Sequence, residues 1–470
     1  MELNVPSAVT DEGNGPNAST PVASDVCGFV SKLAFEHLPA DVVAQARRCL
    51  LDLIGVAAAG SRTPSTSIVN AFTAAQLGGR DAGARVLFDG RRVGVAGAAF
   101  AGAATIDSFD AHDGHMLTKG HMGVAVLPAL LAYIDGDQTR TPIDGREFIT
   151  CLVLGYEIAT RAGIALHATT ADYHCSGAWN SLACAAIGAR LLRLDRERLR
   201  HALGIAEYFG PRGQILRVCD TPTMMKDGSS FGALAGVSAA LLARDGFTGA
   251  PALTVEADDV RDKWSDLSTR WRIREQYFKP YPVCHWAQQA IAAALALKRA
   301  HGFAADDVRD VTIESFAEAV ALGAGCELPR NTEEAQYSLA FPVAAALVFG
   351  RVAYDEINAP GLGDPRVARL CKSMTMIEEP AFSRAFPAER WARVRITLND
   401  GRTLVSEPAQ ARGIPTLPLS PDELLAKYRE LATPVLGAAR ASRIESLVDA
   451  LTRDDNAASR LIDELLSSVG

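Results

Sequence analysis

Several features that define other classes of protein are scarce in this 470-residue sequence. Aromatic residues make up 7% of it, and its nine cysteines are scattered without CxxC or zinc-knuckle spacing. A formal net charge of -8 leaves no overall positive field that would hold nucleic acid or an anionic membrane. We therefore expect a reduced, cytoplasmic protein that binds neither, and in which local cationic groups meet any anionic ligand.

Long apolar runs and nucleotide-binding motifs are also missing. The longest nearly unbroken run of small or apolar residues, Phe231 to Ala243, has 13 residues, whereas a membrane-spanning helix needs about 20. We expect neither a transmembrane segment nor a secretory leader. The sequence contains no Walker loop and no convincing GxGxxG motif after a strand, so a nucleotide cofactor is not expected.

The composition that remains, 48% apolar and 22% charged, is typical of a globular protein. Residues 1–23 are rich in Ser, Asn, Gly, Pro and Thr without apolar periodicity and are predicted to be a disordered tail. A helix is expected from Pro39 to Gly60. Further Ala-rich segments predict a compact helical domain over residues 24–269, with helices near 93–107, 122–135, 147–163, 177–194, 197–208 and 230–244.

The pattern changes after Asp266. A helix is expected over 288–301, and alternating residues at 308–316 indicate a strand. Residues 392–407 predict a β-hairpin that turns at Asn399-Asp400-Gly401. We therefore expect a smaller α/β lid domain at 270–408. Amphipathic helices with capping signals, one after Ser420 and one over 439–466, would return to the helical domain within residues 409–470. The predicted fold class is mainly α.

The densest group of chemically active residues is the stretch DSFDAHDGHMLTKGH at positions 107–121. Imidazoles titrate near neutrality, so His112, His115 and His121 are candidates for proton transfer, and Lys119 is a candidate for binding a carboxylate. A solvated polar loop is the alternative.

A metal site is a further alternative for this stretch, because carboxylate and imidazole groups suit divalent ions. Neither a HExxH helix nor an EF-hand spacing is present, so metal binding is disfavoured. Its ligands would be Asp110, His112, Asp113 and His115.

A second candidate segment is YHCSG at 173–177, which precedes a long Ala-rich helix. Ser176 and its neighbours are expected to cap that helix and direct N–H groups at an anion, with His174 beside it. An ordinary capping turn is the alternative. Covalent catalysis by Cys175 or Ser176 is disfavoured because no GxSxG motif surrounds them.

Two further segments carry cationic and polar groups. Lys226 in MMKDGSS opens a small-residue helix and could bind a carboxylate or act as a base, the alternative being a solvated lysine. The proline-rich FKPYPVCHW at 278–286 joins the two predicted domains. Its Lys279, Tyr281, Cys284 and histidine would face an interdomain cleft, unless the segment is only a packed hinge.

Together these segments resemble the MmgE/PrpD family, which includes 2-methylcitrate dehydratase, cis-aconitate decarboxylase and iminodisuccinate epimerase. Further similar pieces are LGIA at 203–206, GFTGAP at 246–251 and EAQYSL at 334–339. The resemblance implies a homodimer with a large helical domain, a smaller α/β lid and the site between them. It also implies small di- or tricarboxylate substrates and neither a metal nor an organic cofactor.

By this resemblance His121 and His174 match the two active-site histidines of the family, and Lys226 matches its lysine. Some motifs depart from the family pattern: His121 is followed by Met-Gly and His174 by Cys-Ser-Gly, where His-Pro is usual. Gln288 stands where a histidine is usual after the cysteine of the third motif. The fold is therefore expected to transfer more safely than the substrate.

The mechanism that we expect is proton transfer next to a carboxylate. His121 and His174 would form the acid/base pair, with His115 as the alternate. Lys226 would bind a substrate carboxylate. Supporting groups would be Lys119 and Lys279 as further cations, Asp110 and Asp113 orienting an imidazole, and His112, Tyr281 and Cys284 lining the site.

A cofactor-independent lyase, either a dehydratase or a decarboxylase, is the leading prediction for the reaction. An epimerase of a substituted succinate that uses the same two-sided acid/base pair is the second. A non-catalytic ligand-binding homologue is the third.

Overall fold

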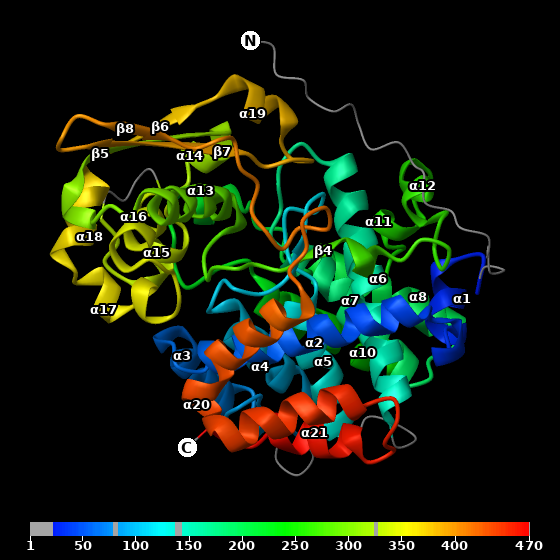
Figure 1. The fold of residues 1–470 in the computed structure, drawn as a ribbon. Coiled ribbons are helices and arrows are strands. Elements are labelled where there is room, and N and C mark those ends of the chain that lie inside the picture. The colour runs from blue at the N-terminus through cyan, green and yellow to red at the C-terminus, as the bar shows by residue number, and fades with distance from the viewer. Residues whose placement is uncertain (1–21, 79–82, 137–142, 324–327, 470) are drawn as a thin grey trace.

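The computed structural model describes residues 22–78, 83–136, 143–323 and 328–469 (Figure 1). The predicted disordered tail lies outside these residues except at its last two positions. Helices dominate, as predicted, and the sheets are small. The first half of the chain contains α1 (Val26–Lys32), α2 (Ala40–Gly60), α3 (Pro64–Gln76), α4 (Val95–Asp107), α5 (Gly123–Asp135), α6 (Gly145–Thr169), α7 (Gly177–Leu191), α8 (Arg196–Phe209), α9 (Leu216–Asp220), α10 (Ser229–Arg244), α11 (Leu253–Glu256) and α12 (Arg261–Trp264), with a short ladder of β1 (Ala84–Arg85) and β2 (Arg92–Val93).

The six predicted Ala-rich segments are confirmed as α4, α5, α6, α7, α8 and α10. Small residues let these helices approach closely, as the α7–α10 pair shows. A Cβ atom added at Gly232 would lie 2.5 Å from the carbonyl oxygen of Gly177, and one at Gly236 would lie 2.2 Å from that of Ser181. Only glycine fits at these two positions, so the small-residue stripes are packing surfaces of the core.

Helix α6 is more apolar than the sequence analysis recognised. It is long and apolar enough to cross a membrane, but 94% of its most apolar window is buried inside the protein. Such burial is typical of a core helix. Helix α6 packs against α5, α7 and α11, and Figure 1 shows it beside α7 and α11.

The second half of the chain contains a four-stranded sheet in the order β6-β5-β7-β8. Strand β5 pairs in parallel with β6 and antiparallel with β7, and β7 pairs antiparallel with β8. Helix α13 packs against β7 and against α16. The elements here are β4 (Gln276–Tyr277), which pairs with β3 (Gly114–His115) of the first half, and then α13 (His285–His301), β5 (Val308–Ser315), α14 (Ala317–Val320), α15 (Thr332–Gln336), α16 (Ala340–Phe349), α17 (Ala359–Leu362), α18 (Pro365–Lys372), β6 (Met374–Glu378), α19 (Pro380–Ala385), β7 (Ala392–Leu398) and β8 (Thr403–Val405).

The predicted hairpin is confirmed. Val394 and Ile396 of β7 are fully buried, while Arg393 and Arg395 pair with Glu314 of the neighbouring strand β5. At the turn Gly401 has a φ of +90°, which glycine adopts without strain.

Two helices end the chain, α20 (Pro421–Ala450) and α21 (Ala457–Leu465). Ser420 and Glu423 form the expected capping box, and Pro421 occupies the first turn. Gly437 kinks α20, and the helix predicted over 439–466 is interrupted between Ala450 and Ala457. Figure 1 shows α20 lying along α2, and the contacts between the two are extensive.

Candidate active site

The site is assembled by a short strand pair that joins two distant parts of the sequence. Strand β3 follows α4, strand β4 precedes α13, and Gly114 is paired with Tyr277. The Tyr277 ring covers Gly114 so closely that an added Cβ would lie 2.5 Å from its hydroxyl oxygen. This pairing places the loop from Asp110 to His121 beside the segment that begins at Lys279.

A small cavity of about 30 Å³ lies between these segments. It is narrow enough that only a few water molecules would fit, so a substrate would enter by displacing lining side chains. Its polar lining consists of Asp110, Lys119, His121, Asp227, Tyr277, Lys279, Cys284, His285, Tyr337 and Arg390.

His121 is held at three points. Its Nδ1 lies 2.5 Å from the carbonyl oxygen of Asp113, its backbone N–H donates to Oγ of Ser176 at 2.9 Å, and its carbonyl oxygen accepts from the indole of Trp179. A carbonyl only accepts, so Nδ1 carries the proton and Nε2 carries the lone pair. Burial, together with the charge of Lys279, lowers the pKa of His121 to about 3. The imidazole of His121 is therefore neutral.

Asp110 and Lys279 form a buried ion pair next to this imidazole. Lys279 Nζ donates to Asp110 Oδ1, which also lies 3.8 Å from His121 Nε2. Burial raises the pKa of Asp110, but the charges around it, with that of Lys279 first, outweigh burial and hold the pKa below its usual value. The carboxylate is thus ionised, and it faces His121 as expected.

Lys226 is linked to the backbone of Asp110 through the side chain of Gln336. Its Nζ donates to Gln336 Oε1 at 2.8 Å, and the backbone N–H of Asp110 donates to the same oxygen at 2.8 Å. Lys226 is buried, and burial lowers its pKa. Lys226 is not among the residues that line the small cavity; it lines a larger one of about 270 Å³. Apolar groups such as Phe100 and Phe231 line much of that larger cavity and suit a polycarboxylate poorly.

Asp113 contributes its backbone to the site, which corrects the prediction for its carboxylate. Tyr156 Oη donates to Asp113 Oδ2 at 2.5 Å, and the side chain is fully buried beside Asp52. Burial, with the charge of Asp52, raises the pKa of Asp113 to about 7. The carbonyl oxygen of Asp113, and not its carboxylate, orients His121.

His112 lies behind His121, outside the lining of the cavity. Its ring centroid is 4.1 Å from that of His121, and neither ring nitrogen has a hydrogen-bond partner among the described residues. Burial holds its pKa well below the usual value. The structure therefore places His112 as a neutral packing partner of His121 and not in contact with a ligand in the cavity.

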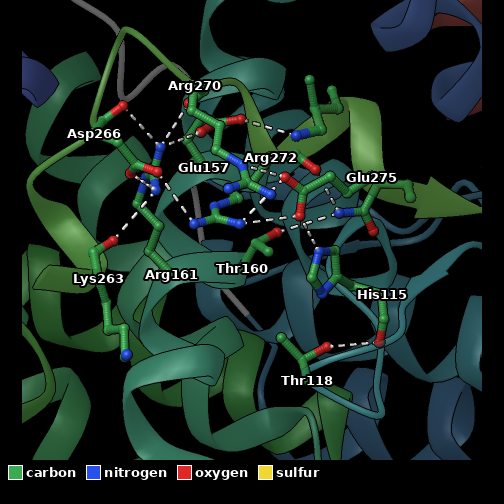
Figure 2. A network of polar contacts seen from close by, with 12 residues as sticks. His115, Thr118, Glu157, Thr160, Arg161, Lys263, Asp266, Arg270, Arg272 and Glu275 are labelled. Carbon is green, nitrogen blue, oxygen red and sulfur yellow. Dashed lines mark hydrogen bonds and ion pairs between the residues drawn. The ribbon is translucent and has the colours of Figure 1, made fainter. Parts of the chain in front are cut away.

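His115 is not among the residues that line the cavity, and Figure 2 shows its ring directed toward Glu275. Its Nε2 lies 2.9 Å from Glu275 Oε2, and Glu275 also pairs with Arg270 and Arg272. The β3–β4 pairing sets His115 opposite Gln276 and turns its ring toward this ion-pair network. The structure thus gives no support to His115 as the alternate acid or base.

His174 also lies outside the described lining of the cavity. Its Nδ1 is 3.1 Å from the carbonyl oxygen of Arg212, and its ring stacks on His167 with centroids 6.3 Å apart. The predicted pair with His121 is not assembled around the cavity. The second imidazole that lines it is His285, whose ring packs 4.1 Å from that of Tyr277.

Ser176 is the N-cap residue of α7, at the predicted position, but its side chain makes no capping hydrogen bond. Its φ and ψ angles are already helical. Its hydroxyl instead donates to Asp227, whose carboxylate also accepts the N–H of Ser176 at 3.1 Å. A protein carboxylate thus occupies the position that was expected for an anionic ligand.

The remaining predicted residues divide into two groups. Lys119 and Cys284 line the cavity, and Lys119 Nζ lies 4.1 Å above the ring of Tyr173. Burial lowers the pKa of Lys119 to about 8 and raises that of Cys284 to about 12, so the thiol stays protonated. Tyr281 is not part of the described lining. The side-chain amide of Gln288 accepts a hydrogen bond from the backbone N–H of Tyr281 and donates one to its carbonyl oxygen.

Several site residues escaped the sequence reasoning: Tyr277, Gln336, Tyr337 and Arg390. His285 had a signal, since it stands within the predicted hinge segment directly after Cys284. Gln336 and Tyr337 lay within the EAQYSL piece of the family resemblance, without an assigned role. Arg390 lies more than a hundred residues beyond the hinge segment and carried no motif.

Three side chains, His121 among them, lie close enough together to be considered as ligands of a cation. Asp110, His112 and His121 each offer a ligand atom within 4.8 Å of the others. Lys279, however, already occupies Asp110, and a second ammonium group lies close by at Lys226. The positive charge of these groups opposes a divalent ion, whereas it suits a carboxylate. Of the metal ligands considered from sequence, Asp113 and His115 are turned away.

Comparison with known proteins shows the family of this chain. Residues 24–266 match the MmgE/PrpD N-terminal domain, and residues 281–453 match the MmgE/PrpD C-terminal domain. The chain belongs to the MmgE/PrpD family. This confirms the resemblance seen in the motifs around His121, His174 and Lys226.

Three relatives illustrate the activities found among similar chains. The cis-aconitate decarboxylase-like protein oryM of Aspergillus oryzae is 27% identical over 93% of this chain and 95% of its own length. The cis-aconitate decarboxylase of Aspergillus terreus is 25% identical over 95% of this chain and 96% of its own. The 2-methylcitrate dehydratase of Cupriavidus necator is 26% identical over 50% and 54%. The prediction of a lyase of the MmgE/PrpD type is confirmed.

Proposed function

We propose that this chain removes carbon dioxide or water from a small di- or tricarboxylate by proton transfer at His121, without a metal or organic cofactor. The observation that carries this proposal is the arrangement of His121. Its Nδ1 is fixed to a backbone carbonyl, and its basic Nε2 lies among Asp110, Lys279 and further cationic groups that line the same cavity.

Substrate binding would change the charge of His121. Burial and the charge of Lys279 disfavour the imidazolium of His121. A substrate carboxylate near Lys279 would offset that charge and raise the pKa of His121. His121 would then hold a proton at Nε2 next to the reacting carbon, with Asp110 stabilising the imidazolium.

In a decarboxylation, the bond between the carbon skeleton and one carboxylate breaks and carbon dioxide leaves. The electron pair stays on the carbon, and His121 delivers the proton that the carbon accepts. In a dehydration, neutral His121 takes the proton next to a carboxylate, and hydroxide leaves from the adjacent carbon with a proton from a second acid. Two relatives that are similar over nearly their full length have names that refer to cis-aconitate decarboxylation, so this direction is favoured.

An epimerase remains the second candidate because another imidazole lines the cavity. His285 and His121 both face it, and Tyr277 packs against His285. If the two imidazoles lay on opposite faces of a planar intermediate, they could invert a carbon centre.

The test is proton NMR of chelator-treated protein in D2O with cis-aconitate, 2-methylcitrate, citrate and substituted succinates. A decarboxylase yields a product with one carboxylate fewer and deuterium at the protonated carbon. A dehydratase yields a new olefinic signal, and an epimerase exchanges a C–H without elimination. Silence across the panel, or turnover that appears only after a divalent ion is added, would contradict the proposal.

A further inference from the structure

Arg390 brings a buried positive charge to the cavity from a part of the sequence that is distant from the other lining residues. It lies between α19 and β7, and its side chain is 2% exposed. The hydrogen bond found for it runs from Nη2 to the carbonyl oxygen of Met116, at 3.2 Å. Its Nε has no partner among the described residues.

No carboxylate in the described part of the chain forms an ion pair with Arg390. Glu318, which is partly buried, acts on it only through longer-range attraction. The guanidinium does not deprotonate in proteins. Burying a charge without a counterion is strongly unfavourable unless a ligand supplies one, so Arg390 is suited to an anion that enters the cavity.

The other cations of the site are already engaged or differ in chemistry. Lys279 is neutralised by Asp110, and Lys226 donates to Gln336. The guanidinium carbon of Arg390 lies 5.8 Å from the centroid of the Tyr277 ring, over its face. Arg390 thus offers a planar donor group at a distinct part of the same cavity, and such a group binds carboxylates with two parallel hydrogen bonds.

We propose that Arg390 binds a second carboxylate of the substrate, separate from the carbon that exchanges its proton with His121. This inference rests on the proposed function and assigns to one residue the recognition of the second carboxylate of its di- or tricarboxylate substrate. Arg390 is then a specificity-determining residue. Monocarboxylates leave its charge buried and unpaired, and are rejected for that reason.

The test measures binding by calorimetry, with succinate, its monoamide succinamate and tricarballylate as probes. The proteins are the wild type, Arg390→Gln and Arg390→Lys. Arg384→Gln is the matched control, since Arg384 is exposed on α19 and the substitution removes the same charge. Circular dichroism and thermal unfolding confirm that each variant is folded.

The wild type is expected to bind succinate more tightly than succinamate, and tricarballylate more tightly still. In Arg390→Gln the affinity for the two diacid or triacid probes should fall about 10- to 100-fold, as loss of a charge-assisted contact predicts. Succinamate should bind almost as before, so that the preference for succinate disappears. Arg390→Lys should retain part of the preference, and Arg384→Gln should match the wild type.

The inference would be overturned by an equal loss for succinate and succinamate, which marks a purely structural role, or by no loss at all. A wild type that binds none of the probes would overturn it as well. If the wild type binds tricarballylate through Arg390 but turns over nothing in the NMR panel, the proposed reaction fails while the carboxylate site stands. If cis-aconitate is turned over, Arg390→Gln should raise KM more than it lowers kcat.

Discussion

The imidazole of His121 is fixed by Asp113, whose carbonyl oxygen lies 2.5 Å from its Nδ1. This contact fixes the tautomer and aims Nε2 at Asp110. The carbonyl is held in turn, because Tyr156 binds the carboxyl group of the same residue. The chemistry proposed for the site therefore depends on a backbone position as much as on the imidazole.

The first prediction concerns Nε2 of His121. In His121→Asn the amide nitrogen can still donate to the Asp113 carbonyl, but the group facing the cavity loses its acid/base function. We expect kcat to fall by about 10²–10⁴-fold while the thermal midpoint changes little. Steady-state kinetics and thermal unfolding measure both. Unchanged turnover in a folded variant would remove His121 from the mechanism.

The second prediction separates two histidines that compete for the second role. His285 lines the cavity, whereas His174 stacks on His167 outside its described lining. His285→Asn is expected to lower kcat about 100-fold, and His174→Asn less than tenfold. The variants are compared by kcat and by deuterium incorporation in D2O. The opposite order would restore the pair that the family resemblance implied.

The fold was largely predictable because its signals are local. Ala-rich periodicity predicts α4, α5 and α7, and Asn399-Asp400-Gly401 predicts the hairpin turn, since each depends on residues close in sequence. Helix α13 begins at His285, three residues before the predicted start at 288. Cys284 is its N-cap residue, and the prolines at 280 and 282 lie before the helix.

The site was predicted only in part because its geometry depends on long-range pairing. His115 and His121 stand six residues apart in one motif, yet the β3–β4 ladder turns His115 to Glu275 and leaves His121 at the cavity. Arg390 reaches the site only through the path of the chain after α19. Neither outcome has a local signal in the sequence.

The third prediction concerns pH. Burial, assisted by the charge of Arg390, lowers the pKa of Lys119 to about 8, so the lysine is cationic below that pH and loses its charge above it. Because kcat/KM reports ionisations of the free enzyme, it should fall as pH rises through about 8. Lys119→Arg stays charged and should remove this alkaline decline. A decline that is identical in Lys119→Arg would assign it to another group.

The pKa of Lys119 also depends on the charge of Arg390. Removing the guanidinium takes away a like charge that disfavours protonated Lys119. The alkaline decline of kcat/KM in Arg390→Gln should therefore move to higher pH. Arg384→Gln, which removes an exposed charge, should leave it in place.

The fourth prediction concerns stability and starts from Lys427 on α20. Its Nζ donates to Asp52 Oδ1 of α2 and to the carbonyl oxygen of Ala111 at 2.6 Å, so one ammonium group ties α20 to both α2 and the site loop. The Asp52 side chain is fully buried and that of Lys427 is 10% exposed. Lys427→Met leaves an uncompensated buried carboxylate and should lower the free energy of unfolding by about 3–5 kcal/mol at pH 7. Urea denaturation measures this change, and Lys372→Met, at an exposed position on α18, is the control.

The pH dependence of that loss identifies its cause. Burial already raises the pKa of Asp52 in the native protein, in spite of Lys427. Without Lys427 this pKa rises further, so the folded variant binds a proton that the unfolded chain releases near its ordinary pKa of about 4. The deficit should therefore shrink as pH falls from 7 to 5, because a protonated Asp52 carries no charge to compensate. Asp52→Asn in the Lys427→Met background should recover much of the loss at pH 7. A deficit that is independent of pH and is not relieved by Asp52→Asn would show that Lys427 acts through its contact with Ala111 or through packing alone.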